Sequence, residues 1–226
     1  MDAEVLRELF KTAVLNNAIR RETLWGQRCH AYNVQFQPDL IACRSLSKLQ
    51  DWFLQLEPSL LQVPVHAMHI SVARLLDVRQ LYPSDERILW RRHGSAWLAE
   101  LARIAAASRP FPLTYRSIAA TDTAVVAVAE PVECMDQIRL EIARTLRLPA
   151  EIQNRADLVH TTLFRYSGLL GNPSGFVRAT EEAELAIDMT ADTLILCREE
   201  VFPSLKTTAI GQFPLGSVGL DAERPT

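Results

Sequence analysis

Two short runs of this sequence carry the same pattern of chemically active side chains. The first is MHISVAR, residues 68–74, and the second is VHTTLFR, residues 159–165. Each run has a histidine, a hydroxyl two residues later and an arginine five residues later. These residues are His69, Ser71 and Arg74 in the first run and His160, Thr162 and Arg165 in the second. Burying a histidine or serine costs free energy unless it finds a partner, so the repetition in register favours a duplicated functional site.

Two imidazoles on opposite sides of one cleft could move two protons in a single reaction. Histidine titrates near pH ~6.5, so one ring can be neutral while the other is protonated. The neutral ring would take a proton from an attacking oxygen, and the protonated ring would give one to a leaving oxygen, as in-line displacement at phosphorus requires. Ser71 and Thr162 could then donate hydrogen bonds to the non-bridging phosphate oxygens. The pattern does not decide which of His69 and His160 is the acid.

The elements around the two runs repeat in the same order, as strand, helix and strand. The first unit has a strand over 29–38, a helix over 45–56 and the first histidine strand; the second has a strand over 123–131, a helix over 133–146 and the second histidine strand. The proline that ends the leading strand precedes the histidine by 31 residues in one unit, from Pro38 to His69, and by 29 in the other, from Pro131 to His160. This spacing predicts an internal duplication.

The spacing of apolar residues predicts the helices and strands in the rest of the chain. We expect helices over 2–19, 85–108 and 176–187, and further strands over 111–120, 190–200 and 206–215. Ser47 and Gln50 predict a capping box at the start of the first unit's helix. The domain organisation expected is a helical segment over 1–27, one bilobal domain over 28–216 and a polar tail over 217–226.

The paired runs resemble the motif of the two-histidine phosphoesterase superfamily, the 2′-5′ RNA ligase-like group, in which His and Ser/Thr alternate with apolar residues. The copy His69-Ile70-Ser71-Val72 fits fully, whereas His160-Thr161-Thr162-Leu163 has Thr161 at a usually apolar position, which should face away from the cleft. The resemblance covers residues 28–215. It implies an α+β bilobal fold, with two antiparallel sheets facing a central cleft and helices outside. It also implies metal-independent chemistry on 2′,3′-cyclic phosphates or 2′-5′ bonds.

Strict alternation predicts which side chains share a face with the histidines. It groups His69 with Ser71 and Ala73, and His160 with Thr162 and Phe164. Arg74 and Arg165 would then lie opposite, where a surface salt bridge is the simplest role. The family often holds phosphate with a basic residue at the position of Arg165, so both roles stay open for it. Tyr166 would return to the histidine face and either stack on a base or join the core, and Tyr32 is a weaker candidate for stacking.

Composition narrows the class of protein. The chain has 226 residues, 48% of them apolar, and a net charge of −3, which suits a packed core but not a surface that tracks long nucleic acid. The four cysteines have no paired spacing, as in a reducing compartment. No apolar run reaches the length of a membrane span, and the charged N-terminus is not a signal peptide. We therefore expect a cytoplasmic, monomeric protein without a membrane partner.

No motif for another kind of catalytic site accompanies the two runs. His66 and His69 lack the HExxH pattern of a zinc site, and the glycines at 168, 171 and 175 make neither a P-loop nor a GxSxG elbow. We therefore expect no metal and no other cofactor. The function predicted is a phosphodiesterase that acts on a nucleotide or short RNA. The alternatives are a phosphodiesterase for a 2′-5′ oligoadenylate or cyclic-dinucleotide signal, and a nucleotide-binding module without turnover.

Overall fold

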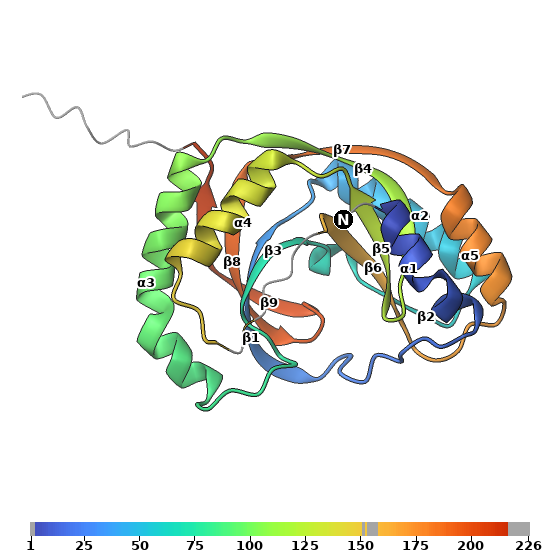
Figure 1. The fold of residues 1–226 in the computed structure, drawn as a ribbon, viewed down its shortest axis with the longest axis horizontal. Coiled ribbons are helices and arrows are strands. Elements are labelled where there is room, and N and C mark those ends of the chain that lie inside the picture. The colour runs from blue at the N-terminus through green and yellow to red at the C-terminus, as the bar shows by residue number, and fades with distance from the viewer. Residues whose placement is uncertain (1–2, 151, 153–157, 217–226) are drawn as a thin grey trace, which may run out of the picture.

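A computed structural model describes residues 3–150, 152 and 158–216, so the predicted tail over 217–226 lies outside the described residues. The described chain forms five α-helices, one short 3-10 helix and a nine-stranded antiparallel sheet (Figure 1). The strands are β1 Arg28–Phe36, β2 Leu60–Gln62, β3 Ile70–Leu76, β4 Phe111–Ala120, β5 Ala124–Ala129, β6 His160–Tyr166, β7 Glu184–Ala191, β8 Thr193–Val201 and β9 Lys206–Pro214. The helices are α1 Ala3–Leu15, α2 Leu40–Leu56, the 3-10 turn η1 Val65–Ala67, α3 Glu86–Ala107, α4 Glu133–Thr145 and α5 Pro173–Glu182. The predicted α+β class is confirmed.

The sheet consists of two matching halves that meet at the histidine strands. Its order is β7-β4-β5-β6-β3-β1-β8-β9, with β2 paired to β6. The two sheets that we expected are continuous, because Ile70 of β3 pairs with Thr161 of β6. These two residues each follow a motif histidine directly, so the pairing joins equivalent positions of the two units. A pseudo-twofold axis therefore passes between β3 and β6.

The helix of each repeat unit packs on the half of the sheet that contains the other unit's strands. Helix α2, from the first unit, packs against β6 and β7, whereas α4, from the second unit, packs against β3 and α3. In Figure 1, α4 lies with α3 on one side of the molecule and α2 lies with α5 on the other. One continuous core of buried residues extends through both halves. Because of this exchange, the two histidine strands are held by helices from both units.

Three helices begin or end at residues other than those predicted. Helix α2 begins five residues earlier than expected, because the Asp39 carboxylate accepts hydrogen bonds from the amides of Ile41 and Ala42, so the predicted capping box was wrong. Helix α1 ends at Leu15 because Asn17 adopts a left-handed conformation, with φ of 55°. The helix predicted over 176–187 was also wrong at its end.

That C-terminal helix, α5, ends at Glu182, and the following residues form the edge strand β7, which pairs with β4 along most of its length. The long helix and the strand over 111–120 agree closely with α3 and β4. Within the described ranges, no helix is both long and apolar enough to cross a membrane.

Candidate active site

The structure brings the two predicted motifs together around one cavity. A cavity of about 250 Å³ opens where the two halves of the sheet meet. His69 and Ser71 from the β3 run and His160 and Thr162 from β6 all line it. All four side chains are partly exposed, unlike the apolar residues between them. Spacing and pattern had therefore predicted correctly that these four side chains share one cleft.

The two imidazoles are fixed in the same way. Nδ1 of His69 lies 2.9 Å from the carbonyl oxygen of Ala67, and Nδ1 of His160 lies 3.5 Å from that of Leu158. A carbonyl oxygen only accepts, so each Nδ1 is the protonated nitrogen of the neutral ring and Nε2 carries the lone pair. Each histidine thus uses the carbonyl two residues before it to set its tautomer, and Nε2 is left for proton transfer.

Burial favours the neutral form of both rings. Desolvation is the main cause that lowers the pKa of His69, and it lowers the pKa of His160 to about 4. The positive charges of Arg74 and Arg165 depress both pKa values further, and each carbonyl contact opposes the shift. In the unliganded site, both histidines are therefore neutral at pH 7 and ready to accept a proton.

A β-bulge at the same position of each motif brings a second set of residues to the cavity. Along β6, Thr162 pairs with Val126 and Phe164 with Val125, so Leu163 is an extra residue. Along β3, Ser71 pairs with Gln35 and Ala73 with Val34, so Val72 is the extra residue. The extra residue shifts the alternation by one place beyond each hydroxyl.

The bulges correct the prediction from strict alternation. Arg74 and Arg165, which we expected on the opposite face, both line the cavity. Ala73 and Phe164, which we expected beside the histidines, are buried in the core. Arg165 is 18% exposed, and burial lowers its pKa to about 10, so it remains a cation at neutral pH. Of the two roles left open for Arg165, a surface salt bridge does not fit, because the side chain lines the cavity and its carboxylate neighbour there, Glu22, is buried.

The two tyrosines proposed to stack on a base lie in the core instead. Tyr166 is 1% exposed, and its hydroxyl donates to the carbonyl oxygen of Thr121 at 2.9 Å. Tyr32 is 3% exposed, and its ring stacks on Trp90 of α3 with centroids 4.3 Å apart. Neither residue lines the cavity, so the stacking hypothesis was wrong for both. For Tyr166 the cause is again the bulge at Leu163, which turns it to the core side.

Thr161, the departure from the family motif, faces away from the cavity as expected. It is fully buried, and its Oγ1 lies 2.7 Å from the hydroxyl of Tyr115 on β4. The threonine therefore has a partner for its hydroxyl inside the core, where an unpaired one would be costly.

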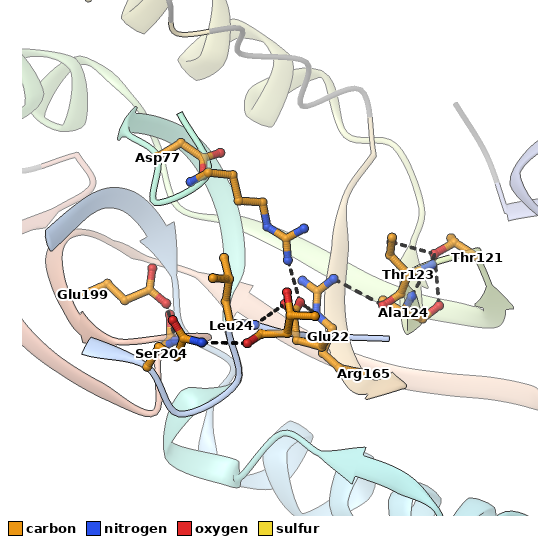
Figure 2. Close-up of polar contacts among 12 residues, drawn as sticks. Glu22, Leu24, Asp77, Thr121, Thr123, Ala124, Arg165, Glu199 and Ser204 are labelled. Carbon is orange, nitrogen blue, oxygen red and sulfur yellow. Dashed lines mark hydrogen bonds and ion pairs between the residues drawn. The ribbon is translucent and has the colours of Figure 1, made fainter. Parts of the chain in front are cut away.

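Charged residues that sequence reasoning missed complete the cavity. Arg20 and Arg79 line it, and Glu199 of β8 is a buried carboxyl group in its wall. Burial raises the pKa of Glu199, against the hydrogen bond that its carboxylate accepts from the amide of Ser204. Glu22, which is also buried, joins Arg79 to Arg165 (Figure 2). These residues lie in loops or on separate strands, so no local spacing links them to the motif.

A metal centre has no obvious set of ligands in the part of the chain that the structure describes. No group of three or more His, Cys, Asp or Glu side chains gathers there in a way that could hold a metal ion. The four cysteines are free thiols, and two of them, Cys43 and Cys197, are buried. The cavity lining offers imidazoles, hydroxyls, guanidiniums and the carboxyl groups of Asp77 and Glu199.

Solved structures share this fold. The protein TT0787 of Thermus thermophilus matches with a TM-score of 0.60 and 16% identity, over 82% of this chain and 98% of that one. LigT of E. coli in its apo form matches with a TM-score of 0.59 and 14% identity, over 84% and 99% of the two chains. A protein described as a phosphoesterase matches with a TM-score of 0.58 and 14% identity, over 83% and 99%. No protein-family model and no curated protein matches the chain.

The comparisons with solved structures show the fold of this chain. The chain has the fold of LigT, of TT0787 and of the protein described as a phosphoesterase, which confirms the predicted resemblance at the level of the fold. LigT has also been solved with 3′-AMP, with ATP and with NADP+. Nearly the whole of each neighbour is matched, whereas 16–18% of this chain lies outside the match.

Proposed function

We propose that the protein is a phosphodiesterase that opens a 2′,3′-cyclic phosphate, or cleaves a 2′-linked phosphodiester, on a nucleotide or short RNA. The observation that carries the proposal is the duplicated geometry of the cavity. Equivalent strands present an imidazole and a hydroxyl from each side, and each imidazole is fixed through Nδ1 by the carbonyl two residues earlier. Such a pair is suited to transfer one proton on each side of a phosphorus atom.

The proposed reaction needs only these groups and a water molecule. One histidine, neutral, takes a proton from the water as its oxygen bonds to phosphorus. The other, protonated, gives its proton to the ribose oxygen as the bond from that oxygen to phosphorus breaks. Ser71, Thr162 and Arg165 bind the non-bridging oxygens, on which negative charge concentrates. A cyclic phosphate gives one product, which carries both the phosphate monoester and the freed hydroxyl, whereas a linear diester gives two. Product then leaves, and one proton passes from the first imidazole back to the second through solvent.

Because both pKa values are low, the histidine that acts as the acid must gain its proton when substrate binds. Both rings are neutral in the free cavity at pH 7, and a neutral histidine cannot act as the acid. A phosphodiester brings a negative charge between the two rings and raises their pKa values, so one ring can take up a proton as substrate binds. The arginines limit this effect, because their positive charges act against imidazolium.

The structural neighbours support a nucleotide as the substrate. LigT was solved with three nucleotide ligands, and one neighbour is described as a phosphoesterase. The chain has a net charge of −3, yet four arginines line the catalytic cavity. Positive charge is thus local to the cavity, which suits a small phosphate-bearing substrate better than a long nucleic acid.

The test is turnover of 2′,3′-cyclic nucleotides and short 2′-5′ oligonucleotides by the purified protein and its His69→Ala and His160→Ala variants. Each substitution should lower turnover by about 10²–10⁴-fold, the usual range for a positioned acid or base. The double variant should lose much less than the product of the two effects. His66→Ala is the control, because His66 is exposed and hydrogen-bonded to Leu205 outside the cavity.

Thermal melting of the same proteins separates chemistry from folding. We expect the melting temperatures of both histidine variants to stay close to that of the wild type, since the imidazoles reach the cavity. Full activity of either variant would refute the two-histidine mechanism. Nucleotide binding by the wild type without turnover of any of these substrates would replace it with the non-catalytic binding module.

A further inference from the structure

The chain before β1 forms part of the wall of the catalytic cavity. Arg20 lines it, and residues 20–24 line a second cavity of about 210 Å³. The two cavities share Arg20, Arg79 and Thr123, so they are direct neighbours. This segment lies in the region 1–27 that the family resemblance does not cover, and it has no counterpart in the other repeat unit.

Backbone hydrogen bonds tie this segment to the second half of the sheet. The amide of Arg20 donates to the carbonyl of Asp122 at 2.6 Å, and the amide of Glu22 donates to that of Tyr166 at 2.8 Å. Asp122 lies in the turn between β4 and β5, and Tyr166 ends β6. The Arg20 side chain is also paired with the Asp122 carboxylate at 2.7 Å. The segment is therefore held in place on the mouth of the cavity.

Glu22 organises the arginines at the junction of the two cavities. Its side chain is 5% exposed, and its Oε2 contacts Arg79 at 2.5 Å and Arg165 at 3.9 Å. Its Oε1 accepts a hydrogen bond from the amide of Leu24 at 3.1 Å. Figure 2 shows Glu22 with Leu24 and Arg165 beside it. The negative charge of Glu22 is thus shared by Arg79 and Arg165, and it holds their side chains beside the motif.

The charges around the two cavities exceed what one phosphate requires. Together the linings contain five arginines and three carboxyl groups. One of these carboxyls is Glu199, which is buried in the cavity wall and accepts a hydrogen bond from the amide of Ser204. Arg165, the two motif hydroxyls and the imidazoles can surround the reacting phosphate. Arg20 and Arg21 then remain at the outer end, where Arg20 is 70% exposed and its surface ion pair with Asp122 is a weak restraint.

We propose that Arg20, Arg21 and Arg79 form a second anion subsite, which binds a second phosphate group of the substrate. The substrate class is then a nucleotide that carries another phosphate beside the one between the histidines, such as a 5′-phosphorylated nucleotide or a short oligonucleotide. This inference rests on the proposed function for the position of the first phosphate. Guanidiniums suit the task because they donate several hydrogen bonds to one phosphate.

The test compares two ligands that differ by one phosphate. Calorimetric titration with 3′-AMP and with adenosine 3′,5′-bisphosphate gives two dissociation constants for each protein. The wild type should bind the bisphosphate about tenfold more tightly, and the Arg20→Ala/Arg21→Ala variant should reduce this ratio to below about twofold. Arg91→Ala/Arg92→Ala is the matched control, because it removes two neighbouring exposed arginines of α3 that line neither cavity. It should keep the tenfold ratio.

A charge reversal provides a second variant at an exposed position. Arg21→Glu should make the bisphosphate bind no more tightly than the monophosphate. A ratio near one in the wild type, or a tenfold ratio retained in both variants, would overturn the second subsite. Because these titrations need no turnover, they are independent of the catalytic test. A clear preference for the bisphosphate, combined with no hydrolysis of any cyclic phosphate, would refute the proposed reaction and leave the second subsite standing.

Discussion

The pH dependence of turnover follows directly from the environment of the two imidazoles. The proposed reaction requires one neutral and one protonated ring, so kcat/KM should follow a bell with two apparent pKa values that belong to the pair. Burial lowers the pKa of both rings below about 6.5, and that of His160 to about 4. A phosphodiester keeps one negative charge throughout this range. The optimum of kcat/KM should therefore lie on the acid side, between pH about 4 and about 6.5.

The size of the decline on the alkaline side can be worked out. Above the higher apparent pKa, the population with one proton falls tenfold per pH unit. At pH 8 this amounts to a loss of at least about 30-fold relative to the optimum, because pH 8 lies about 1.5 units above the ordinary histidine value. The profile of kcat reports the complex with substrate, where the phosphate raises both pKa values. Its alkaline limb should therefore lie at higher pH than that of kcat/KM.

Initial rates from pH 4 to 9, with a 2′,3′-cyclic nucleotide at low and saturating concentrations, measure both profiles. Ser71→Ala is the control, because it removes a hydroxyl that does not titrate in this range. It should lower the height of the bell and leave both limbs in place. A kcat/KM that stays level or rises up to pH 9 would refute the reasoning, since it would point to hydroxide or another base in place of the imidazole pair.

Further predictions concern single groups of the cavity and its surroundings. Thr162→Val should lower turnover by about 10–10³-fold with an unchanged melting temperature, as expected for a lost donor to the phosphate; a loss through unfolding would contradict this. Tyr166→Phe should cost about 1–2 kcal/mol of stability and leave KM unchanged, because its hydroxyl serves the carbonyl of Thr121 inside the core; a raised KM would restore the stacking role. Chelation by EDTA should leave the rate unchanged, and a loss restored by zinc or manganese would contradict the acid–base mechanism. The salt dependence of binding to a short RNA should reflect about one to three neutralised phosphates, and a steeper slope would indicate a longer binding surface.

Spacing alone was enough to predict that the four motif residues lie on one cavity, and to predict the order of most elements. Strand–helix–strand units end in His69 and His160, and the structure places both histidines on one cavity. The roles assigned to Tyr166 and to Arg165 depended on how far alternation persists along a strand. A bulge at Leu163 ends it, and the sequence there has no glycine or proline to signal the irregularity.

Other features of the site could not be read from local patterns. Glu22 and Arg79 meet across 57 residues of sequence, and their contact exists only because the N-terminal segment folds back onto β6. By contrast, the start of α2 could have been predicted, because Asp39 directly follows Pro38 just beyond β1 and is a good N-cap residue. The error there came from preferring a capping box at Ser47 and Gln50, eight residues after the true N-cap.

The near-twofold symmetry of the cavity has a consequence for the direction of the reaction. Two equivalent imidazoles, held by equivalent carbonyls, form a site that by itself does not distinguish the forward reaction from its reverse. Exchanging which ring starts protonated converts phosphoester cleavage into its microscopic reverse, in which a sugar hydroxyl attacks and water leaves. Only groups without a partner across the axis can orient a substrate between the rings. Arg20 and Glu22 are such groups, because they come from a segment that the duplication does not repeat, so this segment would decide which sugar oxygen faces which histidine.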